Sequence, residues 1–125
     1  MTDHWRVAHA FDSSLPGWLV VTPRAHLLAM SQLSAEAAAE LGPLLSGLSR
    51  ALADVTGCLK TYLMQFSEAE GFSHLHLHVV PRMSDQPEDE RGPGIFTRLG
   101  ADLETRVPVD EMDRLAAAVG AALRR

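Results

Sequence analysis

The sequence predicts an α+β fold, in which a mainly antiparallel sheet of about five strands carries a long helix and a C-terminal helix. Three observations support this fold class: short strand-like runs bounded by turn residues, a long leucine-rich stripe with helical periodicity, and a polar, hairpin-like connection. The chain has 125 residues, enough for a substantial core, and we expect a single domain over residues 1–125.

Two strands are predicted before the long helix. The first covers residues 4–11 and leads into a turn that contains a Pro-Gly pair. The second is the uninterrupted apolar run over residues 18–22, whose length and β-branched content favour a buried central strand that ends at Pro23. His26 follows in the loop at the strand exit, a place where scaffolds present functional groups. Taken alone, His26 is more simply explained as a surface histidine.

Two helices complete the predicted elements. The first has Ser34 as its N-cap and Gly57 as a left-handed C-cap. Its apolar positions step by four, three, four and three, which is typical of a helix packed on a sheet: Leu41, Leu45, Leu48, Leu52 and Val55. Gly42 and Pro43 predict a kink or a local break within it. The second helix is predicted over residues 108–125, with acids near its start and arginines at its end.

Three of the six histidines stand at alternate positions in the strand-like segment 74–82. Residues 58–66 form the preceding strand, and the short polar connection predicts an antiparallel hairpin that places the histidine segment inside the sheet. Successive side chains on a strand point to opposite faces. The imidazoles of His74, His76 and His78 are therefore expected on one face, which the long helix leaves free. The apolar residues between and after them are expected in the core: Leu75, Leu77 and Val79.

Composition restricts the location and the partners of the chain. Sixteen acidic residues against eleven basic ones give a net charge of −5, which argues against binding to nucleic acid polymers or an anionic membrane surface. No apolar run approaches about 20 residues, so no transmembrane helix is predicted. Residues 1–5 lack the start of a secretory signal, and we expect a cytoplasmic protein. The single cysteine, Cys58, is expected to be a buried, inert thiol.

Three hypotheses account for the row of histidines. In the first, imidazoles bind a metal ion, but His74 and His78 lie about 13 Å apart along an extended strand, so a complete site needs His26 or a carboxylate. In the second, one neutral imidazole is a nucleophile toward phosphorus, and its neighbours orient it and stabilise charge in the transition state. In the third, the imidazoles are structural, which is costly because each buried polar group needs a partner.

The segment 74–80, His-Leu-His-Leu-His-Val-Val, matches at every position the signature of the histidine triad (HIT) family, His-φ-His-φ-His-φ-φ with φ apolar. Residues 19–26 resemble the apolar strand of that family and its Pro-Lys/Arg-x-His segment, and a leucine-rich helix follows. The resemblance covers roughly residues 5–96. It implies a HIT-like α+β fold, usually a homodimer. It also implies a nucleotidyl hydrolase or transferase that acts at the α-phosphate of a nucleotide and uses no cofactor or metal.

The resemblance implies a role for each histidine. His76 would be the nucleophile that becomes nucleotidylated, and His78 would contact the α-phosphate. His74 would support the orientation of His76, and His26 would assist from its loop. The implied substrates are dinucleoside polyphosphates or nucleoside phosphoramidates, with a purine nucleoside expected.

One stretch departs from the family pattern. The position that usually carries glutamine holds Glu70, and the usual hydroxyl position holds Gly71. An acid there repels a polyphosphate unless it is protonated or turned away. Two alternatives to an enzyme therefore stay open: a non-catalytic nucleotide-binding HIT module, and a histidine-ligated metal site.

Overall fold

The computed structural model describes residues 2–125, so Met1, the first residue of the expected domain, lies outside the described residues. Four antiparallel strands form one sheet in the order β1-β2-β4-β3. The strands are β1 (Trp5–His9), β2 (Leu19–Pro23), β3 (Lys60–Met64) and β4 (Leu77–Arg82). The helices are α1 (Ala35–Thr56) and α2 (Val109–Leu123), with short 3-10 helices η1 (Met30–Gln32), η2 (Glu88–Glu90) and η3 (Gly92–Arg98).

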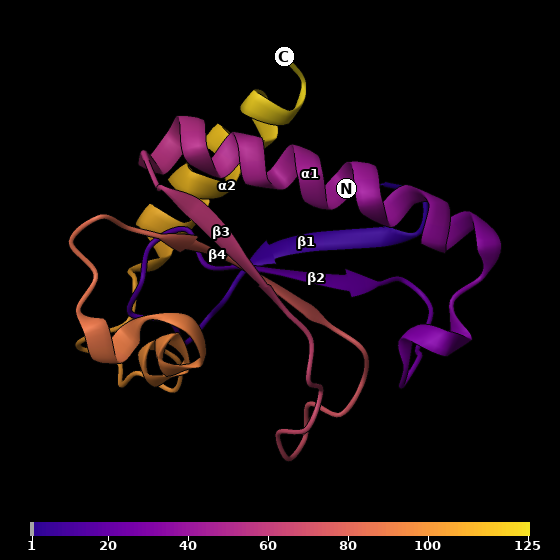
Figure 1. Ribbon diagram of the computed structural model, residues 1–125, viewed down its shortest axis with the longest axis horizontal. Helices are drawn as coiled ribbons and strands as arrows, with labels where there is room; N and C mark the ends of the chain where they lie inside the picture. Colours follow the sequence, from indigo (N-terminus) through magenta and orange to yellow (C-terminus); the bar gives the residue numbers. More distant parts are fainter. Residues whose placement is uncertain (1) are drawn as a thin grey trace.

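This arrangement confirms the α+β class with a long helix and a C-terminal helix. Figure 1 shows α1 lying along one side of the sheet, with α2 packed beside α1 and the hairpin connection between β3 and β4 extending away from both helices. The described residues form four strands, one fewer than the five or so expected. The chain after β4 turns into η2 and η3 because two prolines and two glycines there interrupt any strand ladder. No helix among residues 2–125 is long and apolar enough to cross a membrane.

Helix α1 begins and ends as the sequence predicts. The Ser34 hydroxyl accepts a hydrogen bond from the amide of Ala37 at 3.1 Å, and Gly57 takes the left-handed conformation at φ 73°. The local break predicted at Gly42 and Pro43 is wrong, since the helix is continuous through Pro43. Buried leucines lie on both sides of the proline, and their packing on the sheet outweighs one lost backbone hydrogen bond.

The face of the sheet toward α1 forms the main core. Strand alternation places apolar side chains from three strands there, as predicted for the histidine segment: Trp5, Leu19, Val21, Leu77 and Val79. Leu75 joins the same cluster. The opposite face is left free by the long helix, as expected, and the triad histidines line a pocket there. Trp18 and η3 cover part of it, because Val20, Val80 and Ile95 need apolar neighbours of their own.

Strand β4 lies between β2 and β3, as the predicted hairpin requires. His78 stands opposite Val20 on β2 and Met64 on β3. The strand begins only at Leu77, so His74 and His76 lie in the extended chain before it. The ladder starts late because β3 ends at Met64, and residues 65–76 leave the sheet as a long connection.

Candidate active site

A pocket of about 620 Å³ lies on the sheet face opposite α1, within the range usual for small-molecule sites. The three triad histidines line one side of it, and the 3-10 helix η3 and the turn after β1 line another. The residues that form its surface are Ala8, His9, Ala10, Phe11, Asp12, Val20, Phe66, Ser67, Glu68, Ala69, Phe72, His74, His76, His78, Phe96 and Leu99. The structure therefore brings the triad together at a concave site.

His76 is held by hydrogen bonds on its ring and on its backbone. Its Nδ1 lies 3.0 Å from the carbonyl oxygen of His74, and its backbone N–H donates to the hydroxyl of Ser67 at 3.3 Å. A carbonyl oxygen only accepts, so Nδ1 of His76 carries a proton, and in the neutral ring Nε2 then keeps its lone pair. Ser67 also accepts from the Gln65 amide at 2.8 Å and has φ 55°, a conformation uncommon for a residue with a Cβ. The base of the hairpin connection thus fixes the orientation of the His76 ring.

The ring of His78 is held by a hydrogen bond of the opposite direction, in which its Nδ1 is the acceptor. The indole Nε1–H of Trp18 donates to its Nδ1 at 2.9 Å, and both side chains are buried. The Trp18 and Phe96 rings meet the imidazole edge-to-face, at centroid distances of 5.6 and 5.1 Å. Burial, reinforced by the neighbouring His76, lowers the pKa of His78 to about 4, so the ring is neutral at physiological pH.

His74 and His26 form the outer part of the histidine row. The His74 ring lies 5.6 Å from that of His76, and the His26 ring lies 6.2 Å from that of His74 on the other side. His26 is exposed and stands outside the pocket lining among the described residues. The structure therefore brings His74 to the pocket and leaves His26 next to it.

Phenylalanines form much of the pocket wall. Phe11 and Phe72 stack with centroids 6.4 Å apart, and Phe66 meets Phe96 edge-to-face at 5.8 Å. The rings of Phe11, Phe66 and Phe72 are substantially exposed, so they can stack on a planar ligand in the pocket. Within residues 2–125 no lysine or arginine lines the pocket, whereas Asp12 and Glu68 do.

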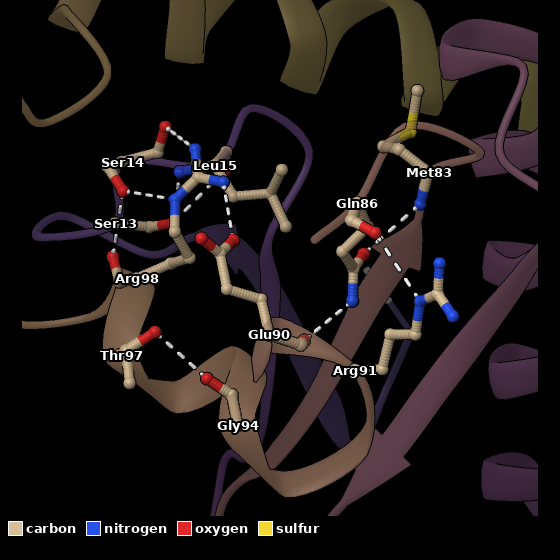
Figure 2. Close-up of polar contacts among 10 residues, drawn as sticks. All are labelled: Ser13, Ser14, Leu15, Met83, Gln86, Glu90, Arg91, Gly94, Thr97 and Arg98. Carbon is tan, nitrogen blue, oxygen red and sulfur yellow. Dashed lines mark hydrogen bonds and ion pairs between the residues drawn. The ribbon is translucent and has the colours of Figure 1, made fainter. Parts of the chain in front are cut away.

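The wall formed by η3 is fixed to the turn after β1 by one arginine. Figure 2 shows Arg98 reaching Ser14 and Glu90. Its guanidinium donates to the Ser14 hydroxyl at 2.6 Å and to the Ser14 carbonyl at 2.8 Å, and it forms an ion pair with Glu90 at 3.1 Å. These bonds add to backbone hydrogen bonds from Ser14 to Arg98 and from Ala101 to Asp12, which join the same two pocket walls.

The unusual residues before the triad are not part of the described pocket lining, although Ala69 and Phe72 on either side of them are. Glu70 is exposed, and Gly71 has φ 80° in the hairpin connection; neither is part of the pocket surface of the described chain. The nearby acid that does line the pocket is Glu68. Across residues 2–125, no three histidine, cysteine or acidic side chains are grouped in a way that could hold a metal ion.

Several residues of the site were not identified from the sequence. Trp18 falls in a predicted strand, Ser67 falls in the polar connection of the predicted hairpin, and no motif marks Phe96. A buried tryptophan generally needs a hydrogen-bond acceptor for its N–H, and this requirement was the one sequence-based indication that Trp18 contacts a polar group. The partner itself lies 60 positions away in the sequence.

Comparisons with known proteins agree with this description. The family model of the HIT domain matches residues 1–85. A histidine triad protein from Sinorhizobium meliloti 1021 matches with a TM-score of 0.79 at 22% identity, covering 98% of this chain and 85% of that chain. A histidine triad protein from Bradyrhizobium japonicum also gives 0.79, at 20% identity, with 98% and 87% covered. No curated protein sequence matches the chain.

A third solved structure is that of an enzyme. The Plasmodium falciparum diadenosine triphosphate hydrolase, in complex with cyclomarin A, matches with a TM-score of 0.71 at 11% identity, covering all of this chain and 75% of that chain. At these identities the structural matches show a shared fold alone. The family model, however, covers the whole sheet, α1 and the triad. The chain therefore belongs to the histidine triad (HIT) family.

Proposed function

We propose that this chain is a nucleotidyl hydrolase or transferase that acts at the α-phosphate of a nucleotide through a covalent intermediate on His76. The observation that carries the proposal is the contact between Nδ1 of His76 and the His74 carbonyl at 3.0 Å. That contact leaves the Nε2 lone pair of a neutral imidazole at the pocket, and such a nitrogen is a competent nucleophile toward phosphorus.

The proposed reaction has two displacements. Nε2 of His76 attacks the α-phosphorus, the bond from phosphorus to the leaving group breaks, and the leaving group departs with the electron pair. The nucleotidylated ring keeps its Nδ1 proton and carries a positive charge, which the His74 carbonyl stabilises. Water or another acceptor then attacks phosphorus and loses a proton, and the electron pair of the P–N bond returns to Nε2.

The neighbouring histidines serve these steps. His78 donates a hydrogen bond to a phosphoryl oxygen, where charge develops in the transition state. His74 lies close enough to His76 to supply a proton to the leaving group, directly or through one water. His26, adjacent to His74, assists this transfer from outside the pocket.

The pocket surface favours a nucleoside phosphoramidate over a dinucleoside polyphosphate. A polyphosphate brings several negative charges next to Asp12 and Glu68, with no cationic side chain among the described lining residues to offset them. An amine leaving group brings no such charge. The stacked rings of Phe11 and Phe72 offer a flat apolar surface for a purine base.

Rapid mixing followed by intact-mass measurement tests the proposal. Adenosine 5′-phosphoramidate and diadenosine triphosphate are each mixed with the protein and quenched within milliseconds to seconds. We expect an added mass of one adenylyl group, and the phosphoramidate to give the higher kcat/KM. His76→Ala should show no adduct and lose at least about a thousandfold in kcat/KM. His4→Ala is the matched control, because His4 contacts Glu40 on α1 and is not among the described residues that line the pocket.

Two results would reject the proposal. One is turnover by His76→Ala at the rate of the unmodified protein. The other is tight binding of nucleotides without turnover of either substrate, which would instead support a non-catalytic nucleotide-binding module.

A further inference from the structure

The contact between Trp18 and His78 has a chemical consequence for the site. The tryptophan side chain is completely buried, the histidine is 8% exposed, and their nitrogens are 2.9 Å apart. Trp18 stands just before β2 and lies outside the pocket lining of the described chain, while His78 is part of that lining. Trp18 therefore reaches the pocket through two lining residues, by a hydrogen bond to the imidazole of His78 and by an edge-to-face contact with Phe96 at 5.7 Å.

The direction of this hydrogen bond is not ambiguous. An indole nitrogen can only donate, so Nδ1 of His78 must be the acceptor and carries no proton. A neutral imidazole with a bare Nδ1 has its proton on Nε2. Among the described residues no buried polar side-chain atom lacks a partner, and Nε2 of His78 is the ring nitrogen left for the pocket.

We propose that Trp18 is a positioning residue that holds His78 as the Nε2–H tautomer, a hydrogen-bond donor that cannot accept a proton from the substrate. The inference rests on the proposed function for the step in which His78 acts, a hydrogen bond to a phosphoryl oxygen. It assigns the two neighbouring histidines opposite roles. His76, whose Nδ1 faces a carbonyl, presents a lone pair, and His78, whose Nδ1 faces an N–H, presents a proton.

The surroundings of His78 favour the neutral ring. The titratable groups that act on it are His76, whose charge disfavours protonation, and Asp12, whose charge favours it. The neighbours from β2, β3 and η3 are Val20, Met64 and Phe96, which do not titrate. Burial outweighs the attraction of Asp12, consistent with a pKa of about 4. The tautomer of the neutral ring therefore decides what His78 can do at physiological pH.

The tautomer is measured directly in the protein without substrate, by long-range ¹H–¹⁵N correlation of the histidine rings near pH 7.5. His78 should show a pyridine-like Nδ1 and a pyrrole-like Nε2, whereas His76 should show the reverse. Assignment uses His78→Asn and His76→Asn. A pyrrole-like Nδ1 on His78 would overturn the proposal, whatever the activity of the protein.

Trp18→Phe removes the N–H and retains an aromatic ring beside Phe96. We expect His78 to populate both neutral tautomers, its pKa to rise, and kcat/KM for adenosine 5′-phosphoramidate to fall by up to about tenfold, the limit at which the hydrogen bond to the charged phosphoryl group is lost altogether. The loss should fall on kcat more than on KM. Trp5→Phe is the matched control, because Trp5 is equally buried and its N–H donates to the Ala37 carbonyl at 2.8 Å, on the other face of the sheet.

The pH profile separates positioning from general destabilisation. A protonated His78 carries an Nε2 proton regardless of tautomer, so the activity of Trp18→Phe relative to the unmodified protein should recover as the pH falls through the raised pKa. A constant deficit at every pH, equal to that of Trp5→Phe, would reject the positioning role. If neither protein turns over nucleotide, the proposed function fails, but the ¹⁵N spectra still decide which tautomer Trp18 imposes.

Discussion

Replacing His78 by asparagine should change the pH dependence of folding stability in a calculable way. Asparagine does not titrate, and its Oδ1 can accept the Trp18 N–H as Nδ1 of the imidazole does. The folded protein lowers the pKa of His78 from 6.5 to about 4. Between these values the unfolded chain binds more protons than the folded chain, so this contribution to stability is complete above pH 6.5 and is lost as the pH falls to about 4.

The size of the effect follows from the two pKa values. One pH unit corresponds to about 1.4 kcal/mol, so the full loss for His78 is about 3 kcal/mol. About 1 kcal/mol is lost at pH 5.5, and most of the remainder by pH 4.5. Burial also lowers the pKa of His9, which acts in the same direction. Since His9 is present in both proteins, its effect cancels in their difference.

Urea unfolding followed by circular dichroism at pH 7.5, 6.5, 5.5 and 4.5 measures this difference. The free energy of unfolding of the unmodified protein, minus that of His78→Asn, should decrease with falling pH, by about 1 kcal/mol at pH 5.5 and by most of about 3 kcal/mol at pH 4.5. The offset at pH 7.5 reports packing and has no bearing on the test. A difference that stays constant from pH 7.5 to 4.5 would refute both the lowered pKa and the burial argument behind it.

Two further substitutions test the close packing at Gly17 and the attachment of η3 to the pocket. Gly17→Ala should destabilise the protein by about 1–3 kcal/mol in the same urea assay, because Gly17 has φ 93° and an added Cβ would lie 3.1 Å from Cγ of Pro81. Arg98→Ala should raise KM about tenfold while still forming the His76 adduct, since the side-chain bonds to Ser14 and the ion pair with Glu90 are lost and the triad is untouched. An unchanged KM would show that η3 does not depend on these contacts.

Local patterns predicted the features that depend on neighbours in sequence. Alternation correctly placed Leu77 and Val79 in the core and the histidines on the other face. Capping rules predicted both ends of α1, because Ser34 and Gly57 act within one turn of the helix. The break predicted at Pro43 was wrong because the cost of a proline in a helix is local, whereas the packing that offsets this cost comes from the sheet.

The electronic details of the site could not be predicted in this way. The state of His78 depends on Trp18, and the two meet only because β2 pairs with β4. Phe96 reaches the histidines from η3, which follows a stretch rich in proline and glycine; such residues indicate the absence of a strand but not where the chain docks. The position of Glu70, exposed outside the described pocket lining, likewise required the backbone path of the hairpin connection.

The pocket wall contributed by η3 comes from a part of the chain that the family model does not reach. That model ends at residue 85, whereas Phe96 and Leu99 line the pocket and Arg98 secures it. Part of the pocket wall is thus encoded outside the stretch that carries the triad, while Phe11 and Phe72 lie within that stretch. Substitutions after residue 85 can retune which substituent fits while the triad is retained, so a motif search by itself is blind to changes in specificity among such proteins.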